Sequence, residues 1–171
     1  MNHLKPLHVK GFINGRPVNN MLVDSGARVN LMPYSLYKKL GGSDEELIET
    51  KRTVKGIGRG KPIRNKGLAL MKLTIGSKTL ATVFFVAIEV QGSYSLILGR
   101  EWIHINICVP SSLHRFLIQW VDDEVEIIHA DSSAYTTTDA PLLGEHDDMI
   151  CLSWRDLTSF ESIEEALFPF L

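Results

Sequence analysis

Leu22-Val23-Asp24-Ser25-Gly26-Ala27 is the stretch of sequence that decides the fold. The apolar residues before the aspartate have the composition of a buried strand, so the carboxylate stands where a strand breaks into a turn. Gly26 permits the close backbone approach that a substrate or a second copy of the chain would need. Asp and Ser also cap ordinary turns, so this stretch alone is compatible with a structural turn as well as with a reactive carboxylate.

Short extended segments surround this stretch. Asn14-Gly15 is the pair that type I′ hairpin turns prefer, and the three glycines within 54–63 predict a mobile hairpin rather than a core strand. Two short helices are predicted, one at 34–40 that ends at Gly41-Gly42 and one that begins at Arg100. The predicted strands lie at 8–13, 17–23, 54–63, 68–75, 80–90, 95–98, 114–120 and 125–129. Many short strands with two short helices indicate an all-β barrel or sandwich.

The composition changes after residue 130. Residues 7–130 are predicted to form one domain, which suits a chain of 171 residues. Residues 131–153 are rich in Ser, Thr and Asp and predict a linker. Residues 154–171 are predicted to be a poorly ordered C-terminal tail with a short amphipathic helix, for which Thr158-x-x-Glu161 is a candidate capping box.

Charge and cysteine content exclude several classes of function. The 18 basic and 20 acidic residues nearly cancel, so we expect no nucleic-acid or membrane partner. Cys108 and Cys151 cannot build a disulfide framework or a zinc site, and the six histidines lack ligand-like spacing, so we expect no metal and no cofactor. The absence of a signal-like apolar segment at the start predicts a cytoplasmic protein.

Three motifs in a fixed order give the sequence its resemblance to a known family. They are the Leu22–Ala27 stretch, the glycine-containing segment Val54–Lys61, and Ile97-Leu98-Gly99-Arg100. In this order they resemble the retropepsins, the aspartic proteases of retroviruses and long-terminal-repeat retrotransposons, in their plant gypsy-type branch. The resemblance covers roughly residues 7–130 and implies a closed, barrel-like half of an acid protease.

The resemblance also implies an aspartic endopeptidase that processes a retrotransposon polyprotein. The chain has one Asp-Ser-Gly, so the second aspartate would come from another copy in a two-fold homodimer, and the pair would share one proton and activate a water. Asp24 would be catalytic, Ser25 would brace the pair across the axis, and Gly26 would meet the substrate backbone. The residues expected to bind the polypeptide substrate are Ala27 and, near the tip of the flap, Gly56, Ile57 and Gly58.

One residue departs from the family pattern. Many retroviral members carry an acid after the alanine, and this chain carries Arg28. Arg28 and Arg100 could then face each other, so either a nearby acid such as Glu101 compensates or the substrate contact and the dimer differ. The departure keeps a second hypothesis open, a catalytically inactive dimerisation or scaffold domain of a degenerate element.

Overall fold

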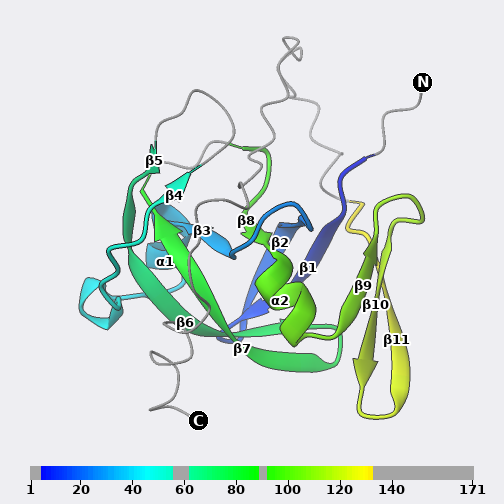
Figure 1. Ribbon diagram of the computed structural model, residues 1–171. Helices are drawn as coiled ribbons and strands as arrows, with labels where there is room; N and C mark the ends of the chain where they lie inside the picture. Colours follow the sequence, from blue (N-terminus) through cyan, green and yellow to red (C-terminus); the bar gives the residue numbers. More distant parts are fainter. Residues whose placement is uncertain (1–4, 56–61, 89–91, 133–171) are drawn as a thin grey trace.

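The computed structural model describes residues 5–55, 62–88 and 92–132, which form eleven strands and two short α-helices (Figure 1). The strands are β1 (His8–Ile13), β2 (Arg16–Val23), β3 (Leu31–Pro33), β4 (Val54–Lys55), β5 (Pro62–Ile63), β6 (Asn65–Ile75), β7 (Lys78–Ala87), β8 (Leu96–Leu98), β9 (Cys108–Ser111), β10 (Phe116–Val121) and β11 (Glu124–His129). The helices are α1 (Tyr34–Lys39) and α2 (Arg100–Ile105), with a 3-10 turn, η1 (Asp44–Glu46).

Six of the strands close into a barrel in the order β1-β2-β8-β3-β7-β6. Most neighbours are antiparallel, but β2 runs parallel to β8 and β3 runs parallel to β7. Two smaller sheets flank the barrel, a three-stranded sheet in the order β11-β10-β9 and the two-stranded hairpin β4-β5. The fold is therefore all-β and closed, which decides between the barrel and the sandwich expected from the sequence.

The β1–β2 hairpin forms at the predicted turn. Asn14 and Gly15 have φ angles of 49° and 78°, the left-handed values that a type I′ turn requires. The hairpin pairs from Ile13 opposite Arg16 to Gly11 opposite Val18 and, after a register shift between Gly11 and Val9, ends with His8 opposite Leu22. The turn and this shift together set the register of β2 and therefore the position at which Asp24 follows its last residue, Val23.

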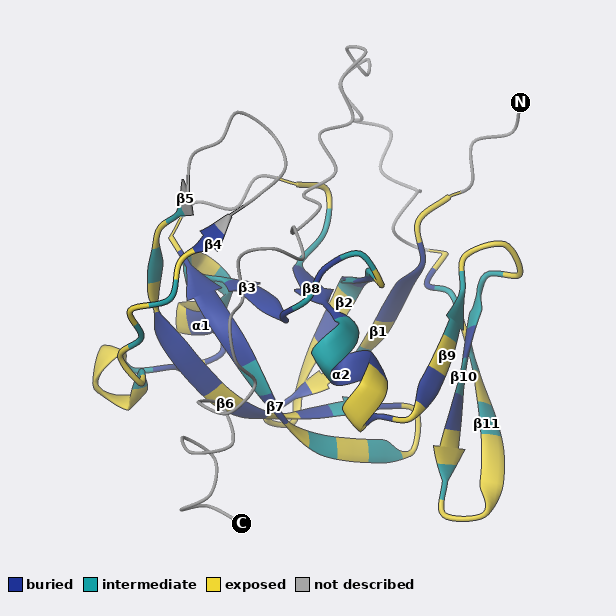
Figure 2. Ribbon diagram, in the orientation of Figure 1, coloured by how far each residue is buried: buried dark blue, intermediate teal, exposed yellow. Residues whose placement is uncertain are grey.

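The buried side chains form two clusters. The larger one fills the barrel and includes Met21, Phe84, Leu96 and Leu98, each 0% exposed, and Trp102 of α2 also belongs to it. The smaller one, here called the loop-side cluster, contains Ala27, Val29, Leu31, Val54, Leu68, Phe85, Ala87 and Ile97. Figure 2 shows the dark blue buried stretches of β7, β8 and β3 meeting in the middle of the molecule. The strands of this central region thus bury side chains on both of their faces.

The other predicted elements are confirmed in part, and some of them lie outside the described residues. Both short helices occur where they were predicted, whereas the sequence did not indicate β3 or β9. The central part of the predicted flap hairpin, 56–61, and all of the predicted tail lie outside the described residues. Asp131, placed at the start of the predicted linker, is 5% exposed, and its carboxylate accepts a hydrogen bond from the backbone of Asn20. Among the described residues, no helix has the length and apolar character needed to cross a membrane.

The close approach of β1 to β6 generates a prediction. A Cβ atom at Gly11 would collide with the backbone oxygen of Thr74, and this oxygen cannot move away without opening the barrel. We expect Gly11→Ala to lower the free energy of unfolding by about 3 kcal/mol, the upper end of the range for overpacking. Gly15→Ala is the control, because no atom lies within 4 Å of its Cβ position and only its positive φ opposes the change, by about 1 kcal/mol. Urea unfolding measures both, and equal losses would contradict the prediction.

Candidate active site

Asp24 follows the last residue of β2 and begins a tight loop, residues 24–28, here called the Asp24 loop. The backbone N–H of Asp24 donates to the carbonyl of Leu98 at 3.0 Å, continuing the parallel pairing of β2 with β8. The Asp24 carboxylate accepts a hydrogen bond from the backbone N–H of Gly26 at 2.8 Å, and the Asp24 carbonyl accepts one from Ala27 at 3.2 Å. The carboxylate is therefore held in one orientation by its own turn.

Exposure alternates along the Asp24 loop in a way that suits a site at its tip. Asp24 and Gly26 are half-buried, Ser25 is exposed, and Ala27 is 0% exposed. The structure thus brings together four of the predicted site residues and anchors them through Ala27. The other three, Gly56, Ile57 and Gly58, lie outside the described residues, so their predicted role stays a prediction.

The Ile97–Arg100 motif and the residue after it are bonded directly to the Asp24 loop. The backbone N–H groups of Arg100 and Glu101, at the start of α2, donate to the carbonyls of Ala27 at 2.8 Å and Arg28 at 3.2 Å. Gly99 must be a glycine, because an added Cβ would collide with the carbonyl oxygen of Val29 and lie 2.8 Å from that of Ala27. The two motifs, about seventy residues apart in the sequence, therefore form one backbone unit.

Asn30 joins this unit to the barrel, and the sequence analysis missed it. Its buried side chain accepts a hydrogen bond from the Gly99 N–H at 2.9 Å and donates one to the carbonyl of Val83 at 3.0 Å. A single polar residue within the apolar run Val29–Met32 was the signal that could have identified it, because a buried amide needs hydrogen-bond partners.

Glu101 lies close enough to Arg28 for their charges to interact, as the sequence suggested. Burial raises the pKa of the Glu101 carboxyl to about 7, while the positive charges of Arg28 and Arg52 oppose this rise. Arg28, the residue that departs from the family pattern, therefore has an acidic neighbour in the same chain, Glu101 of α2.

Tyr94, just before β8, is a further residue that the sequence analysis missed. Its hydroxyl is buried and has no hydrogen-bond partner among the described residues, and its ring packs against the loop-side cluster. Burial raises the pKa of this hydroxyl, and the negative charge of Asp24 raises it further. The structure thus leaves a buried hydroxyl without a partner among the described residues and within electrostatic range of Asp24.

A hairpin stands beside the Asp24 loop. Val54 of β4 is 6% exposed and belongs to the loop-side cluster together with Ala27, and Ile63 of β5 packs against the same cluster. The base of the β4–β5 hairpin therefore contacts the same apolar floor as the loop that carries Asp24. This is the place at which the sequence predicted a flap.

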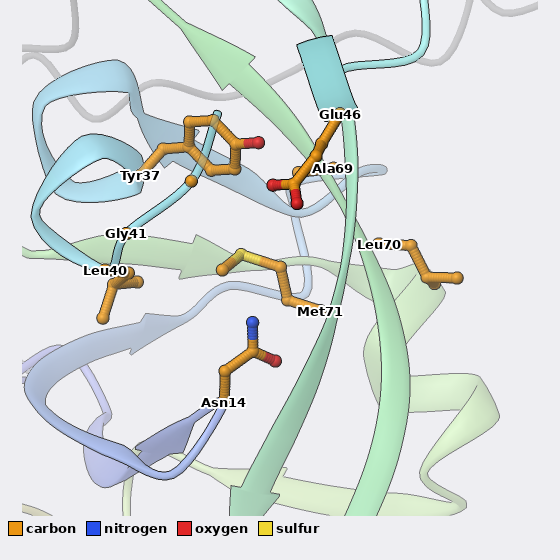
Figure 3. A pocket seen from close by; sticks show the side chains of 9 residues that line it. Asn14, Tyr37, Leu40, Gly41, Glu46, Ala69, Leu70 and Met71 are labelled. Atoms are coloured by element: carbon orange, nitrogen blue, oxygen red, sulfur yellow. The ribbon is translucent and has the colours of Figure 1, made fainter. Parts of the chain in front are cut away.

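A pocket of about 380 Å³ lies elsewhere, on the side of the barrel between α1 and β6 (Figure 3). Its lining includes Asn14, Tyr37, Leu40, Glu46 and Met71, and none of its residues belongs to the Asp24 loop. The described residues also contain no group of three or more His, Cys, Asp or Glu that could hold a metal ion.

The raised pKa of Glu101 predicts how stability changes with pH. Between pH 4.5 and about 7 the unfolded chain has released this proton while the native chain retains it, so stability falls as pH rises through this window. The slope approaches about 1.4 kcal/mol per pH unit for one full proton. Glu101→Gln should flatten the slope by up to that amount, whereas Glu124→Gln, at an exposed strand end, should leave it unchanged. Urea unfolding from pH 4 to pH 8 at one protein concentration measures this, and an unchanged slope in Glu101→Gln would refute the assignment.

Comparisons with known proteins agree with this geometry. The family model described as aspartyl protease matches residues 9–102. Comparison with curated proteins finds no match. Among solved structures, the retroviral protease-like domain of Ddi1 from Leishmania major is similar at 19% identity with a TM-score of 0.55, over 74% of this chain and 95% of that one.

Two further solved structures are similar with lower TM-scores. A retropepsin-like aspartic protease from Rickettsia conorii has 19% identity and a TM-score of 0.47, over 75% of this chain and 86% of that one. The EIAV protease complexed with the inhibitor HBY-793 has 22% identity and a TM-score of 0.44, over 61% and 91%. The family match spans more than half of the 171 residues and includes both the Asp24 loop and Gly99-Arg100. The chain therefore belongs to the aspartyl protease family, and its fold is that of the retropepsin-like proteases.

Proposed function

We propose that this chain is an aspartic endopeptidase that acts as a two-fold homodimer and processes a retrotransposon polyprotein. The observation that carries the proposal is the Asp24 carboxylate, oriented by the Gly26 N–H on a loop whose backbone is bonded to Gly99-Arg100. This is the arrangement that an aspartic protease needs in each half of its site. The order of the sequence motifs supports the retrotransposon origin and a cytoplasmic location, including virus-like particles.

The homodimer follows from the number of aspartates. The sequence contains one Asp-Ser-Gly, and Asp131-Ser132-Ser133 lacks the glycine. Two carboxylates at short distance share one proton, so the ionised one activates a water and the protonated one polarises the scissile carbonyl. A single chain provides half of this pair. Ser25 is exposed at the tip of the loop, where a second copy of the loop would meet it.

A polypeptide substrate suits the surroundings of Asp24. Val54 and Ile63 at the hairpin base and Ala27 on the loop offer apolar contacts to substrate side chains. Tyr94 adds a hydroxyl without a partner among the described residues. We propose that this hydroxyl hydrogen-bonds to the bound peptide and that the predicted flap residues Gly56, Ile57 and Gly58 close over it.

The first test of this proposal replaces the catalytic carboxylate. The purified chain should cleave members of a peptide library, and a statine-type transition-state mimic should inhibit the cleavage. Asp24→Asn should reduce kcat/KM by at least about 10³-fold, since it removes the acid-base pair. Asp122→Asn makes the same chemical change at an exposed hairpin turn and should retain activity.

The dimer adds a requirement to the same test. Specific activity should rise with protein concentration, and a tandem fusion of two copies should remove that dependence. Full specific activity in a dilute, monomeric preparation would contradict the proposal. A wild-type chain that dimerises and cleaves no peptide would instead support the inactive scaffold.

A second prediction concerns the Tyr94 hydroxyl. Because a buried hydroxyl without a partner is destabilising, Tyr94→Phe should raise the free energy of unfolding by about 1 kcal/mol. Loss of a hydrogen bond to the peptide should also raise KM by about tenfold. Tyr37→Phe is the matched control, because the Tyr37 hydroxyl donates to the carbonyl of Ser43 at 2.7 Å and its removal should lower stability. A loss of stability in Tyr94→Phe equal to that in Tyr37→Phe would show that the hydroxyl is paired.

A further inference from the structure

The pocket between α1 and β6 lies at a gap in the wall of the barrel (Figure 3). β1 accompanies β6 only as far as Ile13 opposite Leu73, because β1 ends there. Further along β6, Leu68 forms an isolated bridge with Ile48. Between these two contacts, no strand in the described part of the chain pairs with this edge of β6. The edge is therefore open over a short stretch that borders the pocket.

Leu70 lies in the middle of this open stretch, and its backbone groups face the gap. On one side, Leu68 exchanges both backbone hydrogen bonds with Ile48, at 2.8 and 2.9 Å. On the other side, the C=O of Lys72 accepts from the Asn14 N–H and the Lys72 N–H donates to the Asn14 side chain, both at 2.9 Å. Because alternate residues of a strand point their backbone groups to the same side, the N–H and C=O of Leu70 also point to this edge. Neither group has a partner among the described residues.

The gap suits a short length of extended polypeptide. Leu68 and Lys72 are four residues apart, which corresponds to about 13 Å along a strand, and about two or three residues of another segment fit this length. An extended peptide adds to a sheet at an unpaired edge of this kind, because the edge offers a donor and an acceptor at strand spacing. Leu70 is 42% exposed, so such a segment can reach the edge from the surface.

The pocket beside the gap has an apolar floor and a negatively charged rim. Tyr37, Leu40 and Met71 are buried, and Glu46 is exposed. Figure 3 shows the Glu46 carboxylate and the Asn14 amide pointing toward this space from opposite sides. Burial raises the pKa of the Tyr37 hydroxyl, and the negative charge of Glu46 raises it further, so this charge acts on the pocket. A volume of about 380 Å³ is enough for one long side chain.

Glu46 has no ion pair within the described part of the chain. One oxygen of its carboxylate accepts a hydrogen bond from the backbone N–H that precedes η1, at 3.2 Å. Cations on the neighbouring elements have other partners, because Lys38 and Lys66 pair with Asp44 and the Arg16 guanidinium donates to the last carbonyl of α1 at 2.9 Å. A cationic ligand would therefore meet a carboxylate that no other charge compensates.

Strand geometry decides which residue of an added segment enters the pocket. A residue paired with Leu70 points its side chain to the same face as the Leu70 side chain, away from the core. The next residue of the segment points to the opposite face, the one on which Ala69 and Met71 lie. On that residue, a long apolar stem can contact Leu40 and Met71 while a charged tip stays at the rim beside Glu46.

We propose that this pocket binds an extended polypeptide segment through one lysine or arginine residue. The residue next to it pairs with both backbone groups of Leu70, and the basic tip pairs with Glu46. The amide nitrogen of Asn14, which has no partner among the described residues, donates to a carbonyl of the segment. The pocket and the Asp24 loop share no residue, so the proposal does not depend on protease activity.

The first experiment tests the basic side chain. A pentapeptide with blocked ends, Val-Thr-Lys-Thr-Val, is titrated into the full isotope-labelled chain, and the NMR shift of the Leu70 amide reports binding. Replacing the lysine of the peptide by norleucine should weaken binding by at least about tenfold, because a charge-assisted hydrogen bond is lost. Equal affinities of the two peptides, or a Leu70 amide that does not shift with the lysine peptide, would overturn the proposal.

Two matched variants locate the acidic partner. Glu46→Gln keeps an oxygen that can cap η1, because glutamine also serves at this position of a capping box. This variant should bind the lysine and norleucine peptides equally. Glu45→Gln removes the neighbouring exposed carboxylate of the same turn and should keep the preference for lysine. A preference that survives in Glu46→Gln would contradict the assignment.

N-methylated peptides test the pairing with Leu70. Methylating the amide nitrogens of the two residues that flank the lysine removes the hydrogen bond to the Leu70 C=O and should weaken binding by at least about fivefold. The control is methylation of the lysine nitrogen itself, which points away from β6 in an extended segment and should change the affinity little. The reverse order of effects would exclude this pairing. The Asp24→Asn chain should bind the peptide as the wild type does, and a loss of binding would place the peptide at the Asp24 loop and overturn the proposal.

Discussion

The parallel pairing of β2 with β8 is the constraint on which the rest of the site depends. It places Val23 beside Leu98, so the chain leaves β2 at Asp24 just where it leaves β8 at Gly99. The glycine lets the Asp24 loop contact the start of α2, and Asn30 fixes the contact with one amide side chain. A side chain at residue 99 would separate the two backbones and break the bonds between the Asp24 loop and the start of α2.

An apolar surface lies beside this unit. The loop-side cluster contains Ala27 of the Asp24 loop and Val54 at the base of the β4–β5 hairpin, so the loop and the hairpin base share one apolar floor. The other side of the unit is bonded to the start of α2, whose Arg100 N–H donates to the carbonyl of Ala27. The hairpin base and α2 therefore both contact the loop that carries Asp24.

Local sequence signals predicted the parts of the fold that local physics controls. Asn14-Gly15 specified the first hairpin because few residues tolerate two successive left-handed conformations. Both short helices were predicted from their flanking glycine and proline residues. The strands β3 and β9 were not predicted, because each has only three or four residues. β3 owes its extended form to pairing with β7, which lies far away along the sequence, whereas β9 pairs with the nearby β10 across a short turn.

The sequence by itself determined that Asp24-Ser25-Gly26-Ala27 and Gly99-Arg100 form an ordered pair of motifs, because the residue types that permit a tight turn and close backbone contact are local properties. Only the tertiary structure decided that Asn30 bridges these motifs, that Glu101 lies beside Arg28, and that Tyr94 approaches Asp24. The reason is that burial and partnership depend on which distant segments pack together, and a pattern along one strand shows which residues share a face without showing what covers it.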